Sequence, residues 1–271
     1  MEDLKPGAVR ETAKEEGVVR VAIGIAHEGM TGSEAYCNRL SWFKHLGHLE
    51  ERGKLNKENP RFEFYQITVG RVLTPYAREE IANRAEASGM DYLMMIDDDM
   101  IIEQDDIFER LYANQVDIVA PLAFTRGYPH KPVLYSCVEG YDPVAKKDYF
   151  INTTIMNYPK EKLVRCDAVG FGAVLMRMEA VKAVPKPRFM STCGTGEDIY
   201  FCYQAGKLGF KVHMDTRVKL GHVGHPLIVN EGYVDVVRKR DDMQIEKRHG
   251  EYSKYENNTS TPDAVLVLGD R

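Results

Sequence analysis

The stretch DYLMMIDDDM, residues 91–100, decides the fold class of this chain. Residues 91–96 form an apolar run that predicts a buried β-strand, and three consecutive aspartates, Asp97, Asp98 and Asp99, follow it directly. Carboxylates in such a row repel one another unless water or a cation screens their charges. A strand that ends in an acidic turn fits a sheet whose ligands bind at the carboxyl ends of its strands.

Strands and helices alternate on both sides of this stretch. A helix is predicted from Thr74 to about Ser88, with Thr74 as its N-cap, Pro75 in the first helical position and Gly89 after its end. Apolar spacing and turn residues predict the other elements of the first half: strands over 18–26, 61–69 and 117–121, a helix over 33–49, and a helix that Asp105 and Asp106 cap and that ends at Tyr112. The alternation predicts an α/β protein with a mixed, mostly parallel central sheet flanked by helices.

The second half of the chain predicts strands around turns. These strands span residues 131–138, 149–156, 163–168, 211–214, 217–220 and, in the tail, 264–268, with a turn at 140–143 and a helix from Gly196 to Leu208 that Gly209 ends. Because no repeat and no linker divides the sequence, we expect one domain over 18–228. A flexible N-terminal arm, 1–17, precedes it and a C-terminal extension, 229–271, follows it.

The composition of the 271 residues is that of a globular protein, with 44% hydrophobic and 28% charged residues. Acidic residues outnumber basic ones by 41 to 36, and the net charge of −5 argues against a broad nucleic-acid-binding surface. Five cysteines without a CxxC pair predict reduced thiols, and no apolar run is long enough for a transmembrane segment. We expect a cytoplasmic protein.

Acidic residues are concentrated between Asp97 and Glu109, where seven carboxylates occur without one Lys or Arg. One interpretation is a site for Mg²⁺ or Mn²⁺, which take oxygen ligands and often bridge to substrate phosphates. The other is a solvated loop whose aspartates cap the next helix. The strand before Asp97 to Asp99 favours the metal site for these three, and Glu103 to Glu109 fit a cap and a solvated surface.

Two further segments contain titratable side chains that fit a site. Glu197 and Asp198 open a predicted helix, where carboxylates either balance the helix dipole or act as a general base toward a bound hydroxyl. His222 and His225 follow a strand in the glycine-rich GHVGHP, where they are either packing residues or metal ligands. No thiol or third histidine completes a zinc motif there.

Glycines and an arginine supply two weaker signals. Gly170-Phe171-Gly172 interrupts the strand-like run AVGFGAVLM, which indicates either close approach of a ligand to the backbone or a simple bulge. Arg78, on the helix from Thr74, is either a guanidinium for a diphosphate or an exposed helix residue.

Taken together, these segments resemble a GT-A glycosyltransferase, most closely the family 2-like enzymes of bacteria and phages. The resemblance covers roughly residues 18–225 and rests on segments in the family's order: VRVAIGIAH, TPYAREEIANRA, DYLMMIDDDM, DIVAPLAF, AVGFGAVLMRMEAV, GTGEDIYFCYQAGKLGFKV and LGHVGH. It implies a nucleotide-binding half, 18–125, and an acceptor half, 126–228. The residues EGMTGSEAY lack the family's usual proline-rich nucleotide loop, and nothing after Asn230 matches the family.

The resemblance implies roles for the donor side of the site. Asp97 and Asp99 match the two ends of the family's DxD motif, with Asp99 a direct metal ligand and Asp97 near the ribose or the metal's waters. His222 matches a late histidine that completes the metal site, so the implied metal ligands are Asp97, Asp99 and His222. Arg78 matches an arginine near the nucleotide or its phosphates. The implied donor-binding residues are His27, Arg78, Asp97 and Asp98.

On the acceptor side the resemblance implies that Asp198 is the base of an inverting enzyme, or binds the acceptor if the enzyme retains configuration. The implied acceptor- and sugar-binding residues are Gly170, Phe171, Gly172 and Glu197. The implied cofactor is Mn²⁺ or Mg²⁺, and the implied donor is a UDP- or GDP-sugar. The acceptor stays open among a glycan, a protein, a small molecule and modified nucleic acid.

Two other classes of protein are compatible with an acidic turn after a strand. A nucleotidyltransferase has a glycine-rich basic loop after its first strand, whereas GIAHEGMTGSEA contains no Lys or Arg. A non-catalytic module that binds a nucleotide sugar or a glycan would not need the acidic turn, the Glu-Asp pair and the histidine together. The sequence therefore favours metal-dependent glycosyl transfer.

Overall fold

The computed structural model describes residues 16–27, 32–144, 146–192, 195–224, 227–239 and 241–242. The chain separates into two compact units, Met1–Glu231 and Gly232–Arg271, and the fold described below is that of the first. Several predictions fall outside the described residues: the arm up to residue 15, the loop over 28–31, Gly194, His225 and the strand over 264–268.

A nine-stranded mixed sheet forms the centre of the first unit. Its main path runs β12-β11-β5-β10-β3-β1-β2, and β4 and β8 each pair with β11. β1 pairs in parallel with β2 and β3, β11 pairs in parallel with β5, and β10 lies antiparallel between β3 and β5. The strands are β1 (Val18–His27), β2 (Arg61–Gly70), β3 (Tyr92–Asp97), β4 (Met100–Ile102), β5 (Ile118–Leu122), β8 (Leu163–Cys166), β10 (Ala173–Arg177), β11 (Val212–Gly224) and β12 (Leu227–Val229).

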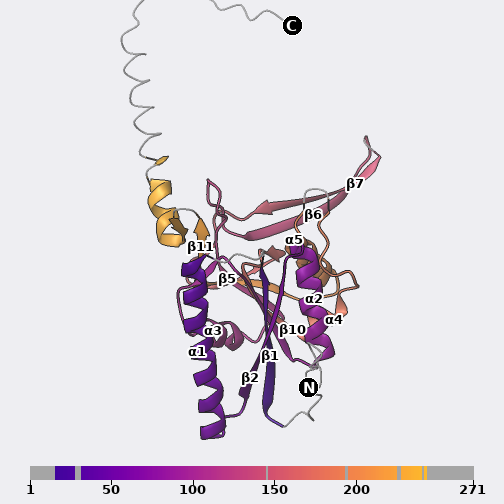
Figure 1. Cartoon of the computed structure of the whole chain (residues 1–271). Coiled ribbons are helices and arrows are strands. Elements are labelled where there is room, and N and C mark those ends of the chain that lie inside the picture. The colour runs from indigo at the N-terminus through magenta and orange to yellow at the C-terminus, as the bar shows by residue number, and fades with distance from the viewer. Residues whose placement is uncertain are drawn as a thin grey trace, which may run out of the picture. The chain divides into compact units, whose positions relative to one another are not determined.

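Helices cover both faces of this sheet (Figure 1). On one face lie α1 (Ser33–Asn56) and α3 (Ile107–Ala113), and on the other α2 (Thr74–Ala87), α4 (Met178–Ala183) and α5 (Glu197–Lys207). The predicted α/β class, with a mostly parallel central sheet flanked by helices, is confirmed.

Alternation along the strands determines which residues face which helices. Ile23 and Met94 belong to the core that includes Trp42 of α1 and Phe108 of α3. The neighbouring residue of β1, Gly24, faces α2, where an added Cβ would lie 2.4 Å from Ile81 Cγ2. The missing side chain therefore lets α2 pack closely against β1.

A second, three-stranded sheet lies beside the first and has the order β7-β6-β9. β6 (Leu134–Asp142) and β7 (Lys147–Thr154) form the long hairpin at the upper right of Figure 1, and β9 (Ala168–Val169) pairs with β6. The predicted turn at 140–143 is wrong for residues 140–142, because these continue the β6 ladder opposite 147–149.

Other differences from the prediction concern helix ends and strands. α1 continues past the predicted end at Leu49, and Leu73, not Thr74, is the N-cap of α2. Asp106 is the N-cap of α3, but its carboxylate accepts a hydrogen bond from Arg110 Nε and makes no cap bond. The two strands predicted over 211–220 are one strand, β11, with a register shift opposite β5. Neither β4 nor α4 was predicted.

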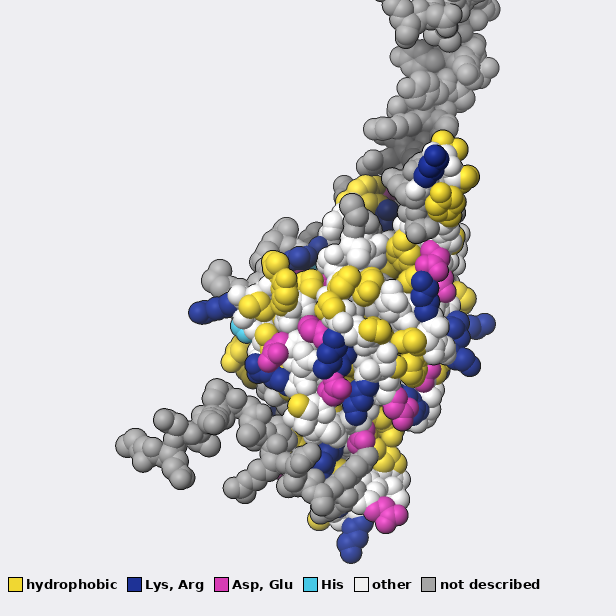
Figure 2. Space-filling view, turned by 90° about the vertical axis from the view of Figure 1, so that its right-hand side faces the viewer, with side chains coloured by type: hydrophobic (Ala, Val, Ile, Leu, Met, Phe, Trp, Pro, Cys, Tyr) yellow, Lys and Arg dark blue, Asp and Glu magenta, His cyan; other side chains and the backbone are white. Residues whose placement is uncertain are grey.

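Charges are mixed on the face of the molecule that Figure 2 shows. Figure 2 shows basic and acidic side chains interspersed over one face, with hydrophobic side chains between them. Within the described residues, no helix is long and apolar enough to cross a membrane. The four cysteines in the described ranges, Cys37, Cys137, Cys166 and Cys202, are free thiols.

Candidate functional site

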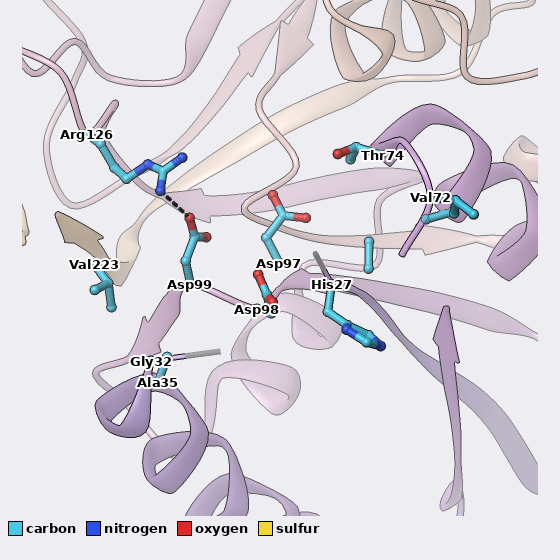
Figure 3. A pocket seen from close by; sticks show the side chains of 12 residues that line it. His27, Gly32, Ala35, Val72, Thr74, Asp97, Asp98, Asp99, Arg126 and Val223 are labelled. Atoms are coloured by element: carbon cyan, nitrogen blue, oxygen red, sulfur yellow. Dashed lines mark ion pairs between the residues drawn. The ribbon is translucent and has the colours of Figure 1, made fainter. Parts of the chain in front are cut away.

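The candidate site is a pocket of about 250 Å³ where β1 and β3 end. Ala26 is the register partner of Asp97, so the carboxyl ends of the two parallel strands lie side by side. This brings His27 together with the three aspartates, as the strand order predicts. The described lining residues are Ala26, His27, Gly32, Ala35, Val72, Thr74, Ala77, Asp97, Asp98, Asp99, Arg126 and Val223 (Figure 3).

The inner end of the acidic turn is Asp97, the last residue of β3. Its carboxylate accepts hydrogen bonds of 2.8 and 2.9 Å from Nη2 of Arg78, whose Nη1 donates to Glu197 Oε1 at 2.7 Å. The Arg78 side chain is only 4% exposed, and its guanidinium also lies over the Phe171 ring. Arg78 therefore contacts acidic residues and is not among the described residues of the lining, and the phosphate contact that the resemblance implies for it stays a prediction.

We call Arg78, Asp97, Glu197 and Asp198 the inner cluster. Burial and neighbouring charges have opposing effects on the pKa values of its members. Burial opposes the charged form of Arg78, but Asp97, Asp198 and Glu197 together raise its pKa above the ordinary value. Burial raises the pKa of Asp97 to about 6, against the opposing influence of Arg78. A further positive charge near Asp97 would favour its ionised form.

The outer end of the turn is Asp99, which faces β11 through a pairing that the sequence did not predict. β4 continues the chain after Asp99 and pairs antiparallel with β11, with Met100 opposite His222. Asp99 O accepts a hydrogen bond from Val223 N, and Asp99 Oδ2 lies 3.2 Å from His222 Nε2. Arg126 Nη1 lies 3.2 Å from the same oxygen. His222 thus acts from within a strand and not from the predicted loop.

The hydrogen bonds of His222 make this pair suitable for a divalent cation. His222 Nδ1 lies 2.8 Å from Phe124 O, and a carbonyl only accepts, so Nδ1 carries the hydrogen. In the neutral imidazole Nε2 would then present a lone pair to a cation bound between His222 and Asp99. Adjacent ligands of an octahedral ion at 2.0–2.1 Å are about 2.9 Å apart, close to the observed spacing.

Asp97 has a different partner from this pair. Its two carboxylate oxygens bind Arg78, and the described residues contain no group of three or more His, Cys, Asp or Glu side chains placed to hold a metal ion. The sequence-predicted trio of Asp97, Asp99 and His222 is thus present as a pair plus one aspartate engaged elsewhere. Burial disfavours the charged Asp99, yet His222 and Arg126 lower its pKa.

Two residues of α1 hold the backbone of the acidic turn, and sequence reasoning missed both. Buried Arg39 donates from Nη1 to Asp97 O and from Nη2 to Asp98 O, while Asn38 exchanges two hydrogen bonds with the backbone of Ile102. A signal was present. Arg39 occupies a position of the buried stripe of α1, where a charged residue must have partners: Ala35, Arg39, Trp42, Leu46, Leu49 and Gly53.

The predicted base, Asp198, lies at the start of α5. Its Oδ2 accepts a hydrogen bond from Phe171 N at 3.3 Å and its Oδ1 one from Ile199 N at 2.7 Å. Burial raises the pKa of Asp198 above its ordinary value, even though the nearby Arg78 charge acts in the opposite direction. Asp198 is held rigidly in the same inner cluster as Glu197 and is not among the described residues that line the pocket.

The Gly170-Phe171-Gly172 segment is buried between β9 and β10. An added Cβ at Gly170 would lie 2.8 Å from Val133 Cβ, and one at Gly172 would lie 2.5 Å from Met100 Cε. Phe171 is 1% exposed and packs under Arg78. Close packing thus explains both glycines, and Gly172 also accepts a hydrogen bond from Asp97 N. Through these contacts the segment packs against the inner end of the acidic turn and the start of β4.

Comparisons with known proteins agree with the fold. No protein-family model and no curated protein sequence matches this chain. Among solved structures it is similar to A197 from STIV, with a TM-score of 0.51 and 16% identity over 78% of this chain and 90% of that one. At this identity the likeness shows a shared fold alone.

Two further solved structures are more distant. One is GalNAc-T7 with UDP, GalNAc and Mn²⁺, with a TM-score of 0.45 and 14% identity over 77% of this chain and 44% of that one. The other is the catalytic domain of Drosophila β1,4-galactosyltransferase 7 in complex with xylobiose, with a TM-score of 0.43 and 15% identity over 76% of this chain and 71% of that one.

Proposed function

We propose that this protein is a metal-dependent glycosyltransferase that moves a sugar from a nucleotide-sugar donor to an acceptor hydroxyl. The observation that carries the proposal is the pairing of His222 Nε2 with Asp99, a residue that lines the pocket where the parallel strands end. A carboxylate and an imidazole whose other nitrogen is already bonded form a donor set for Mn²⁺ or Mg²⁺. The GT-A resemblance of the sequence supplies the reaction class.

Asp99 and His222 would hold the cation, with Asp97 reaching it directly or through water. The bound cation would neutralise the charge that develops on the departing nucleoside diphosphate. His27, Asp98 and the small residues Gly32 and Ala35 line the same pocket, where the nucleotide of a UDP- or GDP-sugar would lie. This assigns donor binding to the half of the domain over 18–125.

The acceptor would be bound by the half over 126–228. In the proposal Asp198 removes the proton of the attacking hydroxyl, and the reaction inverts the anomeric carbon. Support comes from the rigid carboxylate of Asp198 and from its raised pKa, because a base works best with a pKa near the working pH. Glu197 holds Arg78 and so aligns the inner cluster.

The test measures thermal unfolding and nucleotide release with a panel of UDP- and GDP-sugars, with and without Mn²⁺. Stabilisation by a nucleoside diphosphate or its sugar that depends on Mn²⁺ is expected. If no nucleotide in the panel gives it, the donor site is wrong.

Asp198→Asn separates binding from catalysis. It should retain the Mn²⁺-dependent stabilisation and lose turnover by about 10²- to 10⁴-fold, the usual contribution of a general base. Undiminished turnover in this variant would remove Asp198 from the base role and leave the donor site standing.

A further inference from the structure

Arg126 extends into the pocket from the loop between β5 and β6. Its side chain is 60% exposed, and its Nη1 lies 3.2 Å from Asp99 Oδ2 (Figure 3). Within the described part of the lining it is the sole Lys or Arg, facing three aspartates. Arg78, which the sequence implied for the phosphates, is already bound to Asp97 and Glu197.

The loop that carries Arg126 is anchored at its base. Thr125 N donates to Lys131 O at 2.9 Å, and Lys131 N donates to Thr125 Oγ1 at 3.0 Å. The preceding carbonyl, Phe124 O, accepts the hydrogen bond from His222 Nδ1. The backbone at Arg126 is thus held next to Asp99 and His222, while the exposed side chain is free to exchange one partner for another.

Arg126 and a cation on the Asp99–His222 pair compete for one oxygen atom. Asp99 Oδ2 is 3.2 Å from both His222 Nε2 and Arg126 Nη1, so an ion bound between Asp99 and His222 would share this oxygen with the guanidinium and repel its charge. An exposed ion pair of this kind is worth little and is easily broken. A guanidinium released at this point presents two parallel donors to a phosphate.

We propose that Arg126 neutralises Asp99 before a metal ion binds and then turns to the diphosphate of the nucleotide once the ion has taken Asp99. This inference rests on the proposed function and assigns the phosphate contact to an exposed residue of the acceptor half. It explains how a pocket with three aspartates accepts an anionic ligand: Asp97 is paired with Arg78, and the metal ion and Arg126 meet the phosphates.

The experiment uses Arg126→Ala in the full-length chain and measures two dissociation constants by titration calorimetry. The first is that of Mn²⁺ alone. This constant is expected to stay the same or to fall by up to about fivefold, because Arg126 no longer competes weakly with Mn²⁺ for Asp99. The second is that of each diphosphate, UDP or GDP, in saturating Mn²⁺. It is expected to rise roughly 10- to 100-fold, the effect of losing a charge-assisted contact.

The substitution should reduce the affinity for UMP and GMP less than the affinity for UDP and GDP. The reason is that we place Arg126 at the second phosphate, which the monophosphates lack. The matched control is Arg84→Ala, which removes another exposed arginine with an acidic partner, Glu80, outside the pocket, and should change neither constant.

Unchanged diphosphate binding in Arg126→Ala, or weakened Mn²⁺ binding, would overturn the proposal. An equal loss for the monophosphates and the diphosphates would do so as well. If the wild-type protein itself binds no nucleotide with Mn²⁺, both the proposed function and this inference fail. If the wild type binds the diphosphates and Arg126→Ala binds them equally well, only this inference fails.

Discussion

The two ends of the acidic turn each place a carboxylate beside an arginine, but one arginine is buried and the other is exposed. At the inner end Asp97 binds Arg78, whose side chain is 4% exposed and which also holds Glu197. At the outer end Asp99 contacts His222 and Arg126, whose side chain is 60% exposed. One residue, Asp98, separates them along the chain.

The difference shows which end is structural and which is able to respond to a ligand. Removing one partner of a buried ion pair costs about 3–5 kcal/mol, whereas an exposed pair contributes at most about 1 kcal/mol. The inner cluster is therefore a permanent part of the fold that orients the turn. We expect the fold to tolerate the loss of the exposed arginine from the outer pair.

Breaking the inner end should have the largest effect. Arg78→Ala leaves the carboxylates of Asp97 and Glu197 without their cation and opens a gap over Phe171, so we expect a loss of about 3–5 kcal/mol in the free energy of unfolding. Urea denaturation measures it. Arg84→Ala, on the exposed side of the same helix, should cost no more than about 0.5 kcal/mol. A loss below 1 kcal/mol in Arg78→Ala would mean that the inner cluster does not support the fold.

Breaking the outer end should affect ligand-dependent stability instead. Asp99→Ala should change the free energy of unfolding without metal by less than about 1 kcal/mol. It should abolish the stabilisation by Mn²⁺, which for the wild type is about 2.7 kcal/mol at a concentration 100 times Kd. Asp105→Ala replaces an exposed carboxylate of the same acidic segment and should keep the full Mn²⁺ effect. Equal Mn²⁺ effects in Asp99→Ala and the wild type would place the metal elsewhere.

The smallest effect that we expect is on the pH dependence of folding stability, to which Asp198 contributes. Burial raises its folded-state pKa above the unfolded value of about 3.9. The stability that it contributes is therefore fully present below the unfolded pKa and is lost as the pH rises through the folded pKa. Asp198→Asn lacks this titration, so its stability relative to the wild type should increase as the pH rises above about 4. Melting temperatures at several pH values measure the difference, and a flat or opposite trend would contradict the raised pKa.

Much of the fold follows from periodicity that is visible in the sequence. The apolar runs of β1, β3 and β5 and the spacing in α2 and α5 lie where the patterns predict them, because these elements bury one or both faces. The misses are short or irregular. β4 has three residues, too few for a pattern, and the break predicted within β11 is a register shift that leaves the strand continuous.

The grouping of the site residues was predictable in part, and their contacts less so. The order of the strands places His27 beside the three aspartates, and a late histidine does reach Asp99. The sequence could not show that Arg78 faces inward or that Arg126 reaches the pocket. Both depend on the direction of side chains across the sheet: Asp97 points to the α2 face, where Arg78 is, and Asp99 points toward β11.

The sequence by itself determined the alternation of strands and helices and the acidic turn at the end of a strand; the cation that we expect at this turn stays a prediction. Local residue patterns are sufficient for these features. The tertiary structure alone decided which cation belongs to which carboxylate, because burial and the pairing of β4 with β11 arise from contacts between distant segments. For this protein that decision separates an ion pair with a buried arginine at Asp97 from one with an exposed arginine at Asp99.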